Sequence, residues 1–203
     1  MNDTPHDLRV REMKPADCRP VAEIRVAGWR TAYAGLVPQA YLDAMRVTED
    51  AERRRELLLK PGNPVVNLVA ERAGEIVGWA AYGPYRDGEV RTEEAELYAL
   101  YVHPGRWGSG VGAALLRASA ERCAAAGHDR MLLWVLKDNV RARRFYEHHG
   151  FTADGTEEPF EAAGVEVPEV RYVRAPQGAR GTARPAPTDP QPKKQPPAQG
   201  TAP

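Results

Sequence analysis

The chain has 203 residues, of which 42% are hydrophobic and 28% are charged, with 28 basic and 28 acidic side chains. This length and balance are typical of one globular domain, and a neutral chain lacks the basic surplus of proteins that bind nucleic acid or anionic membranes. No apolar stretch could span a bilayer, the first residues lack the regions of a secretory signal, and the two cysteines form neither a disulfide framework nor a zinc motif. We therefore expect a cytoplasmic protein that binds no metal, nucleic acid or membrane.

Residues 175–203 differ in composition from the rest of the chain. They hold 8 of the 18 prolines and no aromatic, Val, Ile, Leu or Met residue. Such a segment cannot bury enough apolar surface to offset its ordering entropy, so we predict a folded domain over 1–174 and a disordered tail over 175–203. Four basic residues against one acidic residue give the tail a net charge of +3 and leave −3 for the domain.

The folded part alternates apolar patterns of period 2 with patterns of period 3.6, which predict strands and helices. Asp17 and Thr48 are placed to cap the first and third helices, Pro38 to open the second, and Gly127 and Gly150 to close the last two. The expected strands are 8–13, 65–71, 76–82, 96–102, 131–136 and 167–173, with one or two strands expected after the last helix. One helix is expected to begin at 17, and four more are expected over 38–45, 49–60, 111–126 and 139–149. This order predicts a single α/β domain.

A glycine-rich loop joins the strand at 96–102 directly to the helix at 111–126. Gly108, Gly110 and Gly112 allow tight turns and a close backbone approach, so that successive N–H groups and the positive helix end can surround a phosphate. No Gly-Lys-Ser/Thr follows, which excludes a P-loop. Gly108-x-Gly110-x-x-Ala113 also matches the dinucleotide fingerprint, and a nicotinamide or flavin enzyme therefore stays an alternative, although no acidic residue ends the next strand at the required spacing.

Two motifs in order carry a resemblance. The first is RWGSGVG over 106–112, and the second is NVRARRFY over 139–146, followed by Gly150-Phe151. Together they resemble the GNAT superfamily of acetyl-CoA-dependent N-acetyltransferases, and AGWRTAYAGLVP over 27–38 is similar to a common bacterial branch of that family. The resemblance covers 8–173 and implies the GNAT fold, a mixed and mostly antiparallel central sheet flanked by helices.

The resemblance implies acetyl-CoA as the co-substrate, without a metal. Its pyrophosphate would lie on the amides of the glycine-rich loop, and its pantetheine arm would pair with the strand backbone near Tyr101 and Val102 and with the Asn139 side chain. Asn139 equally suits the N-cap of the following helix. Trp107 departs from the Gln or Arg that many members carry. The expected cofactor-binding residues are Tyr101, Val102, Arg106, Trp107, Gly108, Ser109, Gly110, Val111, Gly112 and Asn139.

Acetyl transfer to an alkylammonium group of pKa about 10.4 calls for a base, and the departing thiolate calls for a proton. By resemblance, Glu96 aligns with a general-base glutamate and Tyr146 with the general-acid tyrosine of the family. A backbone N–H near Val102 would meet the developing oxyanion. From the residues alone, Glu96 could equally be a solvent-facing carboxylate at a strand edge, and Tyr146 could be a core residue.

Aromatic and acidic residues are candidates for the acceptor site, between the early helices and the segment before the last strand. Trp29, Tyr33 and Tyr41 would line it, although they also suit helix packing, and its acidic rim would be formed by Glu157, Glu158 and Glu161. An acidic rim suits a small cationic amine. A peptide N-terminus stays open, because 139–151 also resembles ribosomal-protein N-terminal acetyltransferases. A non-catalytic acyl-CoA-binding module and a homodimer also stay open.

Overall fold

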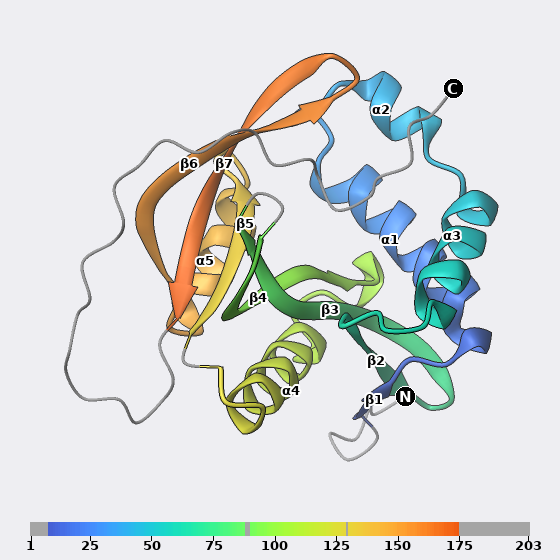
Figure 1. Ribbon diagram of the computed structural model, residues 1–203. Helices are drawn as coiled ribbons and strands as arrows, with labels where there is room; N and C mark the ends of the chain where they lie inside the picture. The colour runs from blue at the N-terminus through green and yellow to red at the C-terminus, as the bar shows by residue number, and fades with distance from the viewer. Residues whose placement is uncertain (1–7, 88–89, 129, 175–203) are drawn as a thin grey trace.

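The computed structural model describes residues 8–87, 90–128 and 130–174 (Figure 1). Within these residues one seven-stranded sheet has the order β1-β2-β3-β4-β5-β7-β6, and only the pair β4 and β5 is parallel. The strands are β1 (Leu8–Glu12), β2 (Val66–Arg72), β3 (Glu75–Asp87), β4 (Val90–Val102), β5 (Met131–Leu136), β6 (Thr152–Ala162) and β7 (Val165–Arg174). The predicted mixed, mostly antiparallel α/β fold is confirmed. The predicted tail at 175–203 lies outside the described residues.

Helices cover both faces of the sheet (Figure 1). They are α1 (Cys18–Ala32), α2 (Gln39–Ala44), α3 (Val47–Leu59), α4 (Val111–Ala125) and α5 (Val140–His148). Leu115 of α4 and Tyr146 of α5 belong to the larger core on one face, whereas Val21 of α1 packs with Val69 and Trp79 on the other. In the part of the chain that the structure describes, no helix combines the length and the apolarity needed to cross a membrane.

Two predicted helix caps are wrong. Helix α3 begins at Val47, so Thr48 lies inside the helix instead of capping it. Asp17 does precede α1, but its carboxylate accepts from the Lys14 backbone N–H at 2.7 Å and from the Arg11 guanidinium at 2.7 and 3.0 Å. A bidentate, charge-assisted pair is stronger than a single cap hydrogen bond, and it therefore draws the side chain away from the helix end.

Strands β6 and β7 form a long hairpin that reaches toward α1 and α2 (Figure 1). The segment before the last predicted strand is thus itself a strand. Near the hairpin tip, Phe160 packs on Trp29 and Tyr41, with ring centroids 6.0 and 5.9 Å apart. The hairpin therefore closes one end of the sheet over the first two helices.

Candidate active site

The sheet opens where its two parallel strands separate. In the described part of the chain, β4 and β5 pair at Ala95 with Met131 and at Glu96 with Leu132, and no strand pairs with β4 on this side beyond Glu96. The His103 N–H donates to Val77 of β3 at 3.0 Å, and backbone groups alternate in direction along an antiparallel pair. The backbone N–H and C=O of Val102 therefore point into the opening between β4 and β5.

The glycine-rich loop borders this opening and contains the short 3-10 turn η3 (Pro104–Arg106). Gly108 and Gly110 have φ values of 78° and 83°, a left-handed conformation that favours glycine. Helix α4 begins without a side-chain cap, which leaves first-turn N–H groups at the positive end of the helix without intrahelical partners. These amides fit the expected pyrophosphate cradle.

The other loop residues mainly hold the cradle in shape. The Ser109 hydroxyl donates to the Arg106 carbonyl at 2.7 Å, and the Arg106 N–H donates to His103 at 2.8 Å. A Cβ at Gly112 would lie 3.4 Å from the Phe145 ring, so Gly112 allows α4 to pack closely on α5. The prediction of an anion-binding loop therefore depends on its backbone rather than on its side chains.

Trp107 connects the end of β4 to α5. Its indole N–H donates to the Val102 carbonyl at 2.9 Å, and the Arg141 guanidinium stacks 3.7 Å above its ring centroid. A pantetheine arm at this edge would find the Val102 carbonyl already engaged and the Val102 N–H pointing toward it. The tryptophan side chain at this motif position thus links the end of β4 to α5.

Asn139 caps α5, as its N-cap alternative predicts. Its Oδ1 accepts from the Ala142 N–H at 3.1 Å, and the residue is buried beside the opening. The cap uses only the carbonyl oxygen of the side chain. The Nδ2 group is the part that a pantetheine arm would use, so both roles are compatible.

Three tyrosines from three elements meet at the opening. Tyr33 of α1 hydrogen-bonds to Tyr101 of β4, and Tyr146 of α5 is close enough for its pKa to be raised by Tyr101. Burial is the main cause that raises the pKa of each tyrosine. Tyr146 is therefore protonated at neutral pH, which a proton donor requires.

The three predicted acceptor-site aromatics do lie together. Tyr33 and Tyr41 pack on Trp29 with ring centroids 4.5 and 5.5 Å away, and Trp29 is only 5% exposed. Its indole N–H lies near the Tyr101 hydroxyl and lowers the pKa of Tyr101. Tyr33 hydrogen-bonds to Tyr101, while Trp29 and Tyr41 also pack with Phe160.

Glu96 is buried, with 5% of its surface exposed, so it is not a solvent-facing carboxylate. It accepts from the Arg86 backbone N–H at 3.3 Å and from the Arg86 side chain at 3.2 and 3.4 Å. Arg86 lies ten residues earlier in the chain, on β3, and β3 and β4 pair as neighbours. The ion pair compensates the charge of Glu96 and holds its carboxylate in place.

Sequence reasoning missed Glu169 of β7. Its register partners are Leu136 of β5 and Glu158 of β6. Burial raises the pKa of Glu169 to about 7, and the charges of Glu158 and Glu96 raise it as well. The period of the last strand could have placed Glu169 on one face, but only the strand order β5-β7-β6 brings it to the opening.

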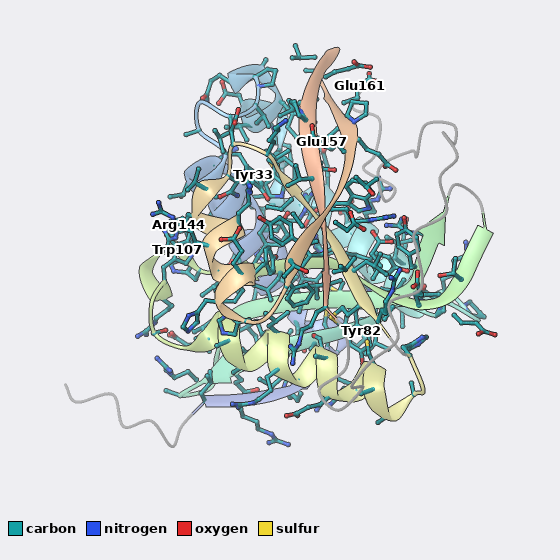
Figure 2. The ribbon with its side chains drawn as sticks, turned by 90° about the vertical axis from the view of Figure 1, so that its left-hand side faces the viewer. Tyr33, Tyr82, Trp107, Arg144, Glu157 and Glu161 are labelled. Atoms are coloured by element: carbon teal, nitrogen blue, oxygen red, sulfur yellow. The ribbon has the colours of Figure 1, made fainter. Side chains whose placement is uncertain are left out.

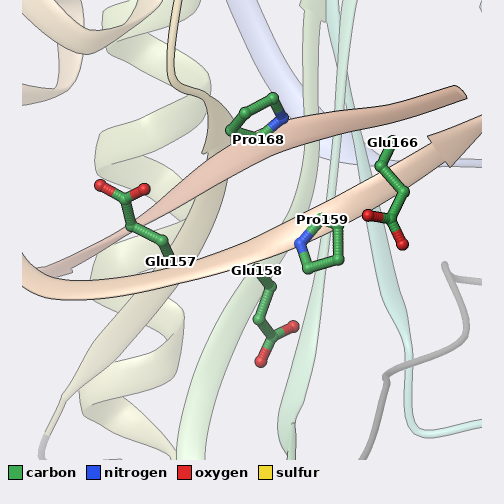
Figure 3. A pocket seen from close by; sticks show the side chains of 5 residues that line it. All are labelled: Glu157, Glu158, Pro159, Glu166 and Pro168. Carbon is green, nitrogen blue, oxygen red and sulfur yellow. The ribbon is translucent and has the colours of Figure 1, made fainter.

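The predicted acidic rim is only partly at the site. Figure 2 shows Glu157 and Glu161 on the hairpin above Tyr33, and Glu157 pairs with Lys137 at 2.8 Å. Glu157 and Glu158 point to opposite sides of the hairpin, beside an open hollow of about 340 Å³ (Figure 3). The hollow is also lined by Pro159, Glu166 and Pro168. Of the three rim glutamates, Glu158 is the one that affects the pKa of a group at the opening.

Comparison with known proteins agrees with this geometry. The model of the acetyltransferase (GNAT) family matches residues 29–151. The uncharacterized N-acetyltransferase YuaI of Bacillus subtilis is 33% identical over 163 residues, which cover 80% of this chain and 90% of YuaI. The L-methionine sulfoximine/L-methionine sulfone acetyltransferase of Salmonella typhimurium is 30% identical over 151 residues, which cover 71% of this chain and 80% of that protein.

A solved structure has the same fold. The PaiA N-acetyltransferase of Thermoplasma acidophilum, determined in complex with coenzyme A, superimposes with a TM-score of 0.67 at 18% identity, and the match covers 83% of this chain and 98% of that one. The separated parallel strands, the glycine loop before α4 and the family match all point the same way. The chain belongs to the GNAT family of acetyltransferases.

Proposed function

We propose that the protein transfers the acetyl group of acetyl-CoA to a primary amine by direct attack within a ternary complex. The observation that carries this proposal is the opening between β4 and β5, because the uncapped start of α4 borders it on one side and the tyrosine cluster on the other. When bound, acetyl-CoA supplies the thioester carbonyl that the amine attacks. The family match supports this donor.

Backbone groups would hold the donor. The amides of Gly108, Gly110 and the first turn of α4 would bind the pyrophosphate, because they combine free N–H groups with the positive end of a helix. The Val102 N–H would bind the thioester oxygen as charge develops on it. Asn139 would donate from Nδ2 to the pantetheine arm while its Oδ1 keeps α5 capped.

Tyr146 would supply the proton that the departing thiolate needs. Its raised pKa keeps the hydroxyl protonated at neutral pH, and Tyr101 and Tyr33 lie beside it. Glu96 is held in an ion pair by Arg86, and a general-base role for Glu96 stays a prediction. The amine would attack the thioester directly, and Cys18 and Cys123 are both buried, so neither thiol is exposed to receive the acetyl group.

A peptide N-terminus is the second candidate acceptor. The hollow on the β6–β7 hairpin is open, and Glu157, Glu158 and Glu166 line it, so a chain with a positively charged end could lie along it. A small amine would use the opening alone. The two acceptors therefore differ in whether the hairpin surface takes part.

A screen for CoA release tests the proposal and separates these acceptors. The full chain would be incubated with acetyl-CoA and a panel of alkylamines, amino sugars, polyamines and short peptides. We expect release with at least one primary amine, and a rise in melting temperature with CoA but not with NAD. CoA binding without release across the panel would instead identify a non-catalytic acyl-CoA-binding module, and stabilisation by NAD alone would favour the dinucleotide enzyme.

A further inference from the structure

Three carboxylates from three strands lie on one face of the sheet. Glu158 and Glu169 are register partners on β6 and β7, and register partners share a face. Glu96 pairs with Leu132 and Glu169 with Leu136, and these two leucines, four residues apart on β5, also share a face. The strand order β4-β5-β7-β6 places Glu169 between Glu96 and Glu158, and the charges of both raise its pKa.

The cations near these carboxylates are already engaged. Arg86 is held by Glu96, at 3.2 Å. Arg171, two residues beyond Glu169 on the same strand, pairs with Asp154 at 2.7 Å and donates to the Tyr85 hydroxyl at 2.9 Å. Among the residues that the structure describes, no hydrogen bond or ion pair holds the Glu169 carboxylate. Glu169 is partly buried, and a partly buried carboxylate without a cation is costly, so a cationic ligand would remove that cost.

Tyr33 connects Glu169 to the tyrosine cluster. The charge of Glu169 raises the pKa of Tyr33, and so do Tyr101 and Tyr146. Leu136, the register partner of Glu169, packs in one cluster with Trp29, and Tyr33 and Tyr101 pack against that cluster. Glu169 of β7 and Tyr146 of α5 thus both lie close to the Tyr33 hydroxyl. A nitrogen bound beside Tyr33 would have a proton acceptor, Glu169, and a proton donor, Tyr146, close to it.

We propose that Glu169 receives the ammonium group of the acceptor and removes its proton, and that the acceptor is a primary amine with no carboxylate on the carbon that bears the nitrogen. This inference rests on the proposed function and names the base and the substrate class of that site. Over the reaction the ammonium nitrogen loses two protons, forms the N–C bond and breaks the C–S bond. One proton ends on the CoA sulfur through Tyr146, and the other ends on Glu169 and then passes to water.

The substrate class follows from the charges that surround the nitrogen. Glu96, Glu158 and Glu169 share one face of the sheet, on β4, β6 and β7, and Tyr33 of α1 packs in the cluster that contains Leu136, the register partner of Glu169. A carboxylate one carbon from the nitrogen would be repelled by Glu169, and Arg86 and Arg171 are already paired. An amide or a hydrogen at that position carries no such charge.

Three matched compounds test this selectivity. 2-Phenylethylamine, phenylalaninamide and phenylalanine share one ring and one amine, and only phenylalanine carries the carboxylate. With the full chain and acetyl-CoA, we expect kcat/KM for the first two to exceed that for phenylalanine by at least about tenfold. Equal values for all three, or a preference for phenylalanine, would overturn the substrate class.

Variants and a pH profile test the role of Glu169. The wild-type rate should fall as the pH drops through about 7, because the base acts only when it is deprotonated, and this change is distinct from the titration of the amine near pH 10. Glu169→Gln should lower kcat by at least about tenfold and remove that change. Glu121→Gln, on the exposed face of α4, should match the wild type. A pH profile lost in Glu96→Gln and kept in Glu169→Gln would assign the base to Glu96 instead.

A measurement that needs no turnover separates this inference from the proposed function. In protein labelled with ¹³C at the glutamate carboxyls, the Glu169 signal is the one absent from Glu169→Gln. We expect it to titrate near pH 7 and to shift when 2-phenylethylamine, but not phenylalanine, is added to the CoA complex. A shift without CoA release from any amine would refute the transferase activity and keep the ammonium site. An active enzyme whose Glu169 signal does not shift when the amine is added would refute the role of Glu169.

Discussion

The two sides of the proposed site are built from different parts of the polypeptide. The donor side uses backbone: the loop glycines, the first turn of α4 and the open edge of β4. The acceptor side uses side chains from α1, β4, β6 and β7, which meet only in the folded chain. A backbone site keeps its chemistry while its side chains vary, whereas a side-chain site changes with each substitution.

This contrast predicts that substitutions on one side should change one ligand and leave the other almost unaffected. The exceptions should be residues that bridge the two sides. Tyr101 is such a residue, because its backbone borders the β4 edge and its hydroxyl belongs to the tyrosine cluster. The following variants test the separation.

Phe160→Ala should have the largest effect. The buried ring packs on Trp29 and Tyr41, and its loss leaves a cavity between the hairpin and the first two helices, at a cost of about 3–4 kcal/mol in the free energy of unfolding. Chemical denaturation measures this loss of stability. We expect a clear rise in KM for the amine in steady-state CoA release, with CoA affinity near wild type in calorimetric titration. Phe160→Leu should lower the free energy of unfolding less and raise KM for the amine less than Phe160→Ala. An equal loss of CoA affinity would show that the two sides are not separate.

Tyr146→Phe should lower kcat by at least about tenfold, because the ring stays packed while the proton donor is lost. CoA affinity and the melting temperature should stay near wild type. Steady-state CoA release and a thermal melt measure these quantities. Unchanged turnover would remove Tyr146 as the general acid.

Gly78→Ala should act on the donor side through packing. Its Cβ would lie 2.8 Å from Val111 Cγ1, 2.9 Å from Leu115 Cδ1 and 3.2 Å from the Tyr101 carbonyl, so these two α4 side chains, or α4 with them, must shift away from β3. We expect a destabilisation of about 1–3 kcal/mol and weaker CoA binding. The matched variant on the acceptor side is Gly28→Ala, whose Cβ would meet the Tyr101 ring at 3.3 Å. It should affect the amine more than CoA, and the reverse pattern would contradict the comparison.

Trp107→Phe should have the smallest effect. It removes the indole N–H that bonds to Val102 and keeps a ring for Arg141 to stack on. The loss of one hydrogen bond corresponds to about 1 kcal/mol, so we expect CoA affinity to fall about fivefold in calorimetric titration. Trp107→Ala, which also loses the stack, should fall further. Tighter binding by Trp107→Phe would mean that the ligand itself needs the Val102 carbonyl.

Much of the fold could be predicted because its signals are local. Strand β5 covers the predicted residues 131–136, and helix α5 starts after its predicted cap Asn139. Gly108 and Gly110 adopt left-handed conformations in the predicted loop. The predicted caps Asp17 and Thr48 are wrong, because Arg11 on β1 holds the first carboxylate and the third helix begins earlier than predicted.

The sequence by itself determined the donor side, since a strand, a glycine loop and a helix that follow one another set backbone direction within a few residues. Only the tertiary structure decided the acceptor side. Glu96 is buried because Arg86 reaches it from the neighbouring strand, and Glu169 comes to the opening because β7 lies between β5 and β6. Carboxylates that look alike in the sequence differ in their partners because strand order, not local pattern, sets what surrounds each of them.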